Sequence, residues 1–582
     1  MKEMDVSHLR AEDGLDGFPF VLGVSGHLDI AQADIAALQA NLVRRLQVYR
    51  ESLGSQIRPF VATALARGGD QLAAEAALEA GWGLIALLPM APDQFLATDD
   101  FVKHPQAAAK FSELIVKSQV HVVCEGVHSI SLDSDITDIQ NQLYRNQSSY
   151  LATHSSVVMA LWDGVDSEDE GCGTLFVVKT CRGQTPSQKM TWGDRLNAPL
   201  DIIQVRKKDA ELDSNPVFTQ LPEGVIDYLI EIRRLTERKA WLSDVQLIEK
   251  SKACLLDEYE KTNPEADKIL QQRWMELDEG SRVLLRAHIQ LDHLSSHFQI
   301  RRHAAIKWAT ALAAFGGVVH SLSMNVNLPL LNFASWVLIG AAALMAFYCL
   351  SERLLSYQAK FIDLRVLAEI LRIQFYWRVA GEKDNLIDLF ENRIGLSGTG
   401  FFSLLSGISA RVASTGHGSE PNADLVNRCW VKGQQQYFEY KSLHYRRLQR
   451  LIKGANIFLL GVAGLGLLLG HVPFHVQTIA SLPSNLSSSV MTLAVFLLAL
   501  LGNFNSAMHF DILLRTYESQ FRLFDAAKGL IGTSLERGTD RLGHLAHVRR
   551  LGIVALQETT EWLRHQREQS FDYKKLAVGQ SA

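Results

Sequence analysis

Four stretches of the chain are long and apolar enough to form helices that cross a bilayer. They cover residues 308–326, 328–350, 454–472 and 487–504, and none contains Asp, Glu, Lys or Arg. Each is close to the roughly 17–25 residues that a spanning helix needs. Core helices of a large soluble protein are the alternative, which four such segments in one chain disfavour. We therefore expect an all-α domain of four transmembrane helices, and the lack of charge disfavours a proton relay or a voltage sensor.

Basic residues flank these stretches asymmetrically. The short connections at residues 320–328 and 471–489 contain no Lys or Arg. Basic residues stand at the opposite ends instead, namely Arg301, Arg302, Lys307, Arg353, Lys360, Arg446, Arg447, Arg450, Lys453 and Arg515. Because basic loops stay on the cytosolic side, this pattern predicts a multi-pass membrane protein with both termini cytoplasmic.

The apolar stretches form two hairpins that are offset by about 150 residues, as in a duplicated unit. Each hairpin follows a polar helix rich in His and Arg, and it precedes an amphipathic helix expected over residues 354–376 or 510–530. We interpret the Arg and His clusters as membrane-flanking anchors rather than ligand sites. Small residues such as Gly316, Gly340 and Gly464 allow close helix approach. The expected partners are therefore the lipid bilayer and further copies of the chain in a homo-oligomer.

The first third of the chain alternates short apolar runs with helical patterns. Strands are expected at residues 18–24, 58–64, 84–89, 120–124, 156–162 and 201–205. Helices are expected between them at residues 31–53, 70–80, 105–117 and 137–153, and from Thr174 onward. This alternation predicts an α/β, doubly wound, Rossmann-like parallel sheet with helices on both faces. Ligands of such sheets bind at the carboxyl ends of the strands.

Glycine-rich turns follow three of the expected strands. Their glycines let a ligand approach the backbone, and the next helix offers free N–H groups and a positive dipole end to a phosphate. Three such turns on one sheet edge predict a ligand of the nucleotide type. The candidate ligand-binding residues are Ser25, Gly26 and His27 after the first strand, Arg67, Gly68, Gly69 and Asp70 after the second, and Trp162, Asp163, Gly173 and Thr174 after a later one.

Side-chain chemistry indicates the role of several of these residues. Ser25 and His27 are candidates to contact a phosphate or a ribose, and Arg67 can pair with a phosphate. Asp70 either caps its helix or accepts a ribose hydroxyl.

Further candidates lie on two later helices. Asn146, Tyr150 and His154 share one helix face at i, i+4 and i+8 spacing. Tyr150 either stacks on a base or belongs to the core. Gly173 and Thr174 open a helix that can hold a second phosphate.

Composition excludes several classes of protein. The net charge of −5 argues against a generally basic protein that coats nucleic acid. The six cysteines form no CxxC pair, which argues against a disulfide framework or a cysteine-based zinc site. We expect no metal and no resident cofactor. The N-terminal segment is polar and lacks the apolar region of a secretory signal, so the sheet domain is expected in the cytosol.

The turn residues resemble the SLOG superfamily, which includes the Smf/DprA proteins and the LOG phosphoribohydrolases. The matching motifs are Gly26-His27-Leu28, Arg67-Gly68-Gly69-Asp70, Ala160-Leu161-Trp162-Asp163-Gly164 and Cys172-Gly173-Thr174. The rest of the chain resembles SLATT-type membrane effector modules. The resemblance implies a bacterial effector of the cell inner membrane in antiphage defence. Its SLOG domain would bind a nucleotide-derived second messenger made by an operon partner.

The chain departs from the family patterns at three places. Leu28 stands where the SLOG turn has an arginine, and Cys172 replaces a glycine. Residues 175–177 are apolar, although the LOG hydrolases carry a catalytic glutamate in this region. We therefore expect ligand sensing without a catalytic residue.

Two alternative functions stay open beside the sensor-effector. One is a membrane-anchored enzyme that processes a nucleotide or NAD with Asp70, Asp163 or Glu170. The other is a ligand-gated ion channel with a housekeeping role, distantly like the animal TRPM channels. The expected domains are a SLOG-like sensor (1–206), a helical connector (207–300), a first transmembrane hairpin with its amphipathic helix (301–380), a cytosolic linker (381–438) and a second hairpin with C-terminal helices (439–582).

Overall fold

The chain forms two compact units. Unit 1 contains Met1–Ser251, Gln271–Ile289 and Ile370–Pro421, and unit 2 contains Lys252–Leu270, Gln290–Glu369 and Asn422–Ala582. The computed structural model describes residues 18–55, 57–123, 136–166, 173–184, 198–207, 218–236, 242, 244–326, 329–350, 352–385, 399–416, 420–470, 486–536 and 541–577.

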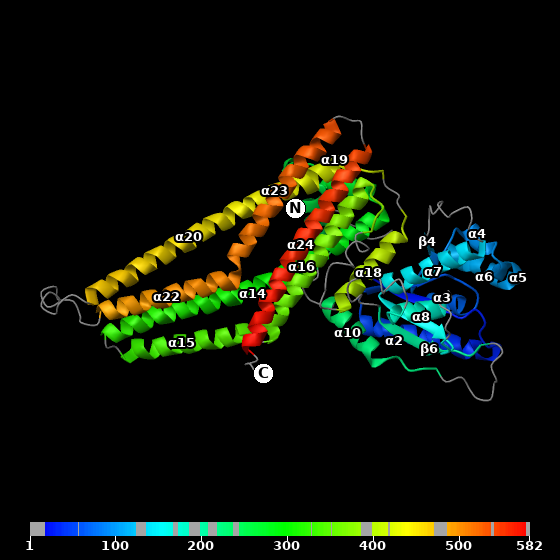
Figure 1. The fold of residues 1–582 in the computed structure, drawn as a ribbon, viewed down its shortest axis with the longest axis horizontal. Coiled ribbons are helices and arrows are strands. Elements are labelled where there is room, and N and C mark those ends of the chain that lie inside the picture. The colour runs from blue at the N-terminus through cyan, green and yellow to red at the C-terminus, as the bar shows by residue number, and fades with distance from the viewer. Residues whose placement is uncertain are drawn as a thin grey trace. The chain divides into compact units, whose positions relative to one another are not determined.

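Six parallel strands form one sheet in unit 1, in the order β4-β3-β2-β1-β5-β6 (Figure 1). They are β1 (Phe18–Gly26), β2 (Ile57–Thr63), β3 (Gly83–Leu88), β4 (Gln119–Val122), β5 (Val157–Trp162) and β6 (Leu200–Gln204). β1 lies in the centre, with Leu22 opposite both Val61 and Val157. The prediction of a doubly wound, Rossmann-like parallel sheet is confirmed.

Helices cover both faces of the sheet because alternate residues of a strand point to opposite sides. The ring of Phe20 lies 6.4 Å from the ring of Tyr49 on one face, measured between centroids. Val21 packs on the other face against Leu151 and Val177. The helices around the sheet are α2 (Ile35–Leu53), which η1 (Gln32–Asp34) precedes, α3 (Gly69–Glu79), α6 (Pro105–Val116), α7 (Ile136–His154) and α8 (Thr174–Cys181).

Two short helices of the sheet region were not predicted. They are α4 (Pro92–Leu96) and α5 (Asp99–Lys103), which lie between β3 and α6. Each is too short to show a helical repeat of apolar residues in the sequence. Their aromatic residues Phe95 and Phe101 are nevertheless buried, with ring centroids 5.1 Å apart.

A helix from far along the chain also packs on the sheet. Residues of α18 (Thr399–Ala413) contact β1, and Ala410 joins Val21 in the same core cluster. Gly407 permits this approach, because a Cβ at its position would stand 2.7 Å from the carbonyl oxygen of Pro19. The fold of unit 1 therefore includes a segment that the sequence assigns to a cytosolic linker.

Further helical segments complete unit 1. They are α10 (Glu223–Thr236), most of α11 (Asp244–Leu255), most of α13 (Ala266–Glu276), the start of α14 (Glu279–Val326) and the end of α16 (Glu352–Ala380). The boundary between the units thus falls inside α14 and α16, which are continuous helices. The domains expected from the sequence end the sheet domain at residue 206 and the helical connector at residue 300.

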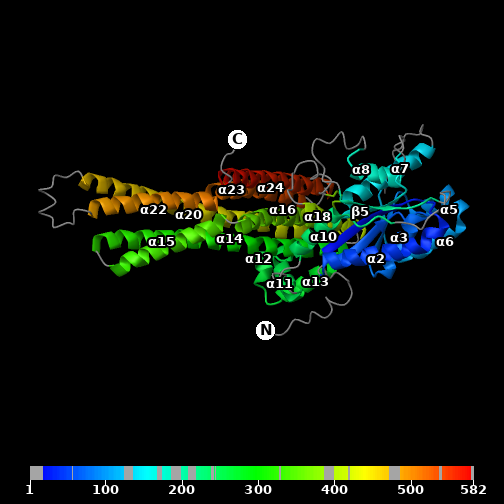
Figure 2. The same cartoon turned by 90° about the horizontal axis from the view of Figure 1, so that it is seen from below.

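Unit 2 is built from helices. In Figure 2, α14 lies beside α15 (Pro329–Leu350), and α20 (Gly433–Gly470) lies beside α22 (Leu486–Met508). α20 also packs along α23 (Phe510–Glu536), which packs along α24 (Arg541–Ala577). The shorter elements are α12 (Glu258–Lys261), α19 (Ala423–Leu425) and the π-helical segment η2 (Val426–Lys432).

A pair of adjacent glycines lies where three helices of unit 2 approach each other. A Cβ at Gly316 would stand 3.3 Å from the Cβ of Leu338 on α15. A Cβ at Gly317 would stand 2.5 Å from the Cε1 atom of Phe496 on α22. This pair allows the close helix approach that the sequence predicts.

Three helices are long and apolar enough to cross a membrane, among the residues that the structure describes. They are Glu279–Ser323, Ala423–Leu468 and Ser488–Met508. The second of the four expected spans coincides with α15, whose described apolar part, Asn332–Leu344, is shorter. Three candidate spans are therefore present, and the fourth stays a prediction.

Apolar side chains of these helices point away from the protein. Trp308 is 64% exposed and Phe458 is 70% exposed, and only about a tenth or less of the apolar 18-residue window in each candidate span is buried. Large apolar surfaces of this kind mark contacts with a membrane or with another protein. The exposure agrees with a membrane location.

Candidate functional site

The strand order reverses between β1 and β5. The chain builds β2, β3 and β4 on one side of β1 and then returns to place β5 and β6 on the other side. The carboxyl ends of both central strands therefore lie together, with Gly26 opposite Leu161. Doubly wound sheets bind ligands in the crevice at such a switch point.

The turns after β1 and β2 pack directly on each other through glycine. A Cβ at Gly26 would stand 2.6 Å from the Cα of Gly69, so neither position has room for a side chain. The Gly69 N–H donates to the carbonyl oxygen of His27 over 2.9 Å. Gly68 has a positive φ of 87°, and a Cβ there would meet the carbonyl oxygen of Leu28 at 2.2 Å. These glycines hold two of the predicted turns together.

Asp70 is a buried carboxylate that supports the first turn. Only 4% of the residue is exposed, and Oδ1 accepts the Gly26 N–H over 2.7 Å. Burial raises its pKa to about 7, although the hydrogen bond from the Gly26 N–H opposes this shift. The alternative that Asp70 caps its helix is wrong, because Gly68 is the N-cap of α3 and no side chain caps this end of the helix. Acceptance of a ribose hydroxyl by Asp70 stays a prediction.

Arg67 is held by two carboxylates. Its Nη1 atom lies 2.5 Å from Oδ1 of Asp29, and its Nε atom lies 3.1 Å from Oδ1 of Asp100. The hydrogen bond to Asp29 contributes most to raising the pKa of Arg67. A phosphate would have to compete with both carboxylates for this guanidinium. In the structure, Arg67 stabilises the turn by linking Asp29 and Asp100.

His27, Asp163 and Lys207 form a charged cluster at the ends of β1, β5 and β6. Nε2 of His27 lies 3.0 Å from Oδ1 of Asp163, and Nζ of Lys207 lies 2.6 Å from Oδ2. Burial raises the pKa of Asp163, but the contacts with Lys207 and His27 outweigh this effect, so the pKa is lowered. Asp163 therefore orients two cationic or hydrogen-bonding groups at the switch point.

Lys207 was missed by the sequence reasoning. Its side chain is about half exposed, unlike that of Asp163. Its place in the sequence could have identified it. Lys207 follows the last strand of a parallel sheet, so it lies at the same carboxyl edge as the glycine turns.

Ser25 and Thr174 join the third turn to the first. Their side-chain oxygens lie 3.2 Å apart and are buried. Gly173 precedes α8 with a φ of 85°, and a Cβ there would meet no atom within 4 Å. No side chain caps this end of α8, so its first N–H groups remain candidate phosphate donors. Cys172 and Glu170 lie outside the described residues.

Trp162 belongs to the protein interior. Trp162 packs against Ala160 and Val178, and the guanidinium of Arg182 lies 5.5 Å from its ring centroid. It is therefore a core residue at the base of the switch point.

Tyr150 and His154 stack on each other, with ring centroids 3.9 Å apart and an interplanar angle of 5°. Tyr150 also packs against the core cluster of the sheet. The ring centroid of His121 lies 5.1 Å from that of Tyr150. Asn146 accepts a hydrogen bond from Gln142 over 2.8 Å. The structure thus gives Tyr150 the core position that the sequence left open beside base stacking.

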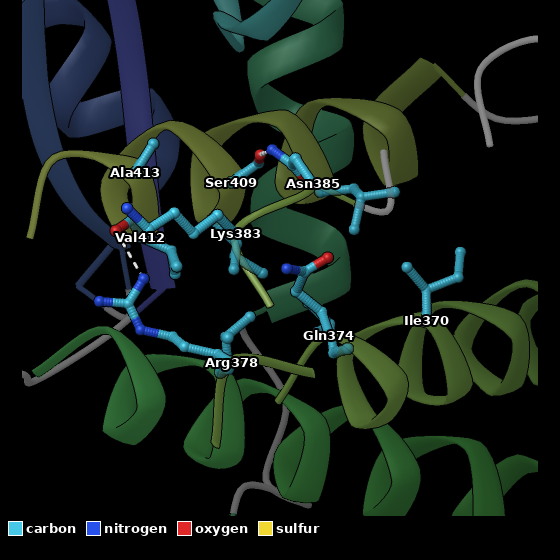
Figure 3. A pocket seen from close by; sticks show the side chains of 12 residues that line it. Ile370, Gln374, Arg378, Lys383, Asn385, Ser409, Val412 and Ala413 are labelled. Carbon is cyan, nitrogen blue, oxygen red and sulfur yellow. Dashed lines mark hydrogen bonds between the residues drawn. The ribbon is translucent and has the colours of Figure 1, made fainter. Parts of the chain in front are cut away.

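A cavity of about 60 Å³ lies elsewhere in unit 1, between α14, α16 and α18 (Figure 3). Apolar side chains such as Leu284 and Ile370 line it together with Gln374 and Lys383. It has room for about four water molecules, so it does not hold a nucleotide. No residue of the glycine turns lines it.

Comparison of this chain with protein-family models, with curated proteins and with solved structures finds no match. The fold and the switch point therefore define the class of protein, a Rossmann-like sheet protein with apolar helices long enough to cross a membrane. Within the described ranges, no three His, Cys, Asp or Glu side chains come together as metal ligands.

Proposed function

We propose that this chain is a membrane effector whose sheet domain binds a nucleotide-derived second messenger. The observation that carries the proposal is the charged cluster at the β1/β5 switch point, where His27 and Lys207 stand beside the glycine turns. A phosphate meets hydrogen-bond donors and positive charge there. Lys207 is the accessible cation, and the uncapped start of α8 adds backbone donors.

Ligand recognition is divided between the two sides of β1. The turn at Gly26 and His27 approaches the ligand from one side, and the turn at Gly173 and Thr174 from the other. Asp163 contacts both His27 and Lys207. This arrangement favours one of two binding modes. The phosphate either displaces Asp163 from Lys207, or it bridges the Asp163–Lys207 pair and the start of α8.

Transmission to the membrane helices uses α14 and α16. Both helices begin or end in the unit that holds the sheet and continue beyond it. Arg411 of α18 is buried, donates to Gln119 of β4 and pairs with Glu279 at the start of α14. A ligand that binds one arrangement of these contacts better by 1–3 kcal/mol would shift the equilibrium by about 5–150-fold.

The effector part of the proposal concerns unit 2. Four spans, formed by parts of α14, α15, α20 and α22, would assemble with further copies of the chain in the cell inner membrane, with both termini in the cytoplasm. The assembly would form or open a pore when the ligand binds. The resemblance to SLOG and SLATT modules supports a role in antiphage defence, with a messenger-producing partner enzyme.

A screen of cyclic and linear nucleotides against the purified full-length protein tests this function. We expect at least one phosphorylated compound to raise the melting temperature and to be recovered intact. Nucleosides without phosphate serve as controls and should leave it unchanged. A screen in which no phosphorylated compound stabilises the protein contradicts the proposal.

The contact between His27 and Asp163 favours one alternative, a membrane-anchored nucleotide- or NAD-processing enzyme. A carboxylate that orients an imidazole can support general base catalysis. The same screen separates the two functions, because the enzyme would convert its ligand to products while the sensor leaves it intact.

A further inference from the structure

Four helices of unit 2 meet at one apolar cluster. Ile452 of α20, Met508 of α22 and Phe510 of α23 are buried together, and Ile306 of α14 packs against them. Because these residues are in contact, the residues that follow them in the chain lie at nearly the same height along the helices.

Basic residues lie next to this cluster along α14 and α20. Lys307 follows Ile306, and Lys453 follows Ile452, with Arg450 and Arg447 one and two turns earlier on α20. All four are exposed, and we name Lys307, Arg447, Arg450 and Lys453 the basic belt. The neighbouring Arg446 pairs with Glu518 over 2.7 Å, whereas the belt residues have no ion pair within the part of unit 2 that the structure describes.

The acidic residue at this height is already engaged. Asp511, which follows Phe510, accepts a hydrogen bond from Gln449 and one from Asn505. Both donors are neutral amides, and no ion pair joins Asp511 to a belt residue within the part of unit 2 that the structure describes. Exposed cations without a protein partner favour an anionic partner from outside the chain.

Exposed apolar side chains continue directly beyond the belt. Trp308 follows Lys307, and Ile457, which is 73% exposed, lies one turn after Lys453. Positions 450, 453 and 457 share one face of α20, because residues three and four apart are neighbours on a helix. A row of cations followed by a tryptophan and exposed aliphatic side chains matches the boundary between headgroups and hydrocarbon.

We propose that the basic belt binds the phosphate headgroups of anionic phospholipids in the cytoplasmic leaflet. This inference rests on the membrane location in the proposed function and goes beyond it by assigning a lipid class and four residues. Arginine binds phosphate through two parallel hydrogen bonds, and lysine adds a point charge. The acyl chains of the same lipid lie against Ile457 and Phe458, which a soluble phosphate cannot use.

Native mass spectrometry of the full-length protein tests the proposal with phosphatidylglycerol and phosphatidylcholine as probes. We expect phosphatidylglycerol to bind more tightly. The double variant Arg450→Gln/Lys453→Gln should lose affinity for it by about 30-fold, since each basic residue near an anionic surface contributes about 5-fold. Its affinity for phosphatidylcholine should not change.

A matched control removes the same charge elsewhere in unit 2. The double variant Lys432→Gln/Lys528→Gln neutralises two exposed lysines on η2 and α23, and it should bind phosphatidylglycerol like the wild type. Equal affinity of the wild type for both lipids overturns the proposal, and so does an unchanged Arg450→Gln/Lys453→Gln variant. Displacement of the lipid by an equal concentration of glycerol phosphate also overturns it, because the site would then recognise free phosphate.

Flotation with vesicles of phosphatidylcholine alone separates this proposal from the proposed function. Wild-type protein that floats with these vesicles but shows no lipid preference keeps its membrane location and loses the headgroup site. Protein that stays soluble without detergent and does not float contradicts both.

Discussion

The Nε atom of Arg378 lies 3.0 Å from both carboxylate oxygens of Asp278, and both side chains are buried. Asp278 also accepts the N–H of Ser281 over 2.6 Å at the start of α14. Arg378 donates further to Thr415, which follows α18. One ion pair thus joins the start of α14, the end of α16 and the end of α18 within unit 1.

Replacing Arg378 with methionine should destabilise unit 1 strongly. The change leaves the Asp278 carboxylate buried without its cation, and breaking a buried ion pair costs about 3–5 kcal/mol. Chemical unfolding of the full-length protein measures this loss. The double variant Arg378→Met/Asp278→Leu should recover part of the stability, because it removes the unpaired charge. A single variant as stable as the wild type would refute this role of the pair.

Asp70 should make the stability of the sheet domain fall as the pH rises. Its pKa is about 7 in the folded protein, whereas an unfolded aspartate titrates near 4. The folded state therefore holds the proton more tightly, and the stabilisation that is complete below about pH 4 is lost as the pH rises to about 7. Asp70→Asn keeps an acceptor for Gly26 N–H and should remove this dependence. Melting curves at pH 5 and pH 8 test it, and equal pH dependence in both proteins would disprove it.

Lys207→Gln should weaken binding of the stabilising nucleotide by about tenfold, as expected for loss of one charge-assisted hydrogen bond. The thermal stability without ligand should stay close to the wild type, because Lys207 is half exposed. Lys103→Gln serves as the control, since Lys103 is exposed and pairs with Asp99 on its own helix. Calorimetric titration measures the affinities. Equal affinities of both variants would place the ligand elsewhere.

Gly317→Leu and Gly464→Leu should have different effects on the membrane helices. A Cβ at Gly317 meets Phe496, so leucine forces α14 and α22 apart and should lower the melting temperature. A Cβ at Gly464 meets no atom of the chain within 4 Å, so leucine should leave the single chain stable. Cross-linking in membranes then shows whether Gly464 lies between copies. A Gly317→Leu protein that melts like the wild type would exclude this contact.

Local sequence patterns were sufficient to predict the sheet. Each strand of the sheet is a short apolar run that ends in a turn, and the glycines at Gly26 and Gly68 mark turns where a side chain has no room. The parallel order follows because helices separate the strands. The positions of Ser25, His27, Asp163 and Thr174 at one edge follow from the same rule.

Contacts between distant segments could not be predicted. α18 shows an apolar pattern, but no local feature indicates that Gly407 packs on Pro19. Arg67 looked free to bind phosphate because its partners, Asp29 in a loop and Asp100 in α5, come from other segments. Likewise, the stacking of Tyr150 on His154 becomes visible only in the folded helix, where i and i+4 side chains meet.

Efflux of a trapped dye from liposomes that contain the full-length protein tests the central claim most directly. The stabilising nucleotide is added outside the liposomes, and the Lys207→Gln variant is measured in parallel. The account predicts rapid dye release with the wild type, and the variant should require about tenfold more nucleotide. Binding of the nucleotide without any release of dye would contradict the coupling between the sheet domain and the membrane helices.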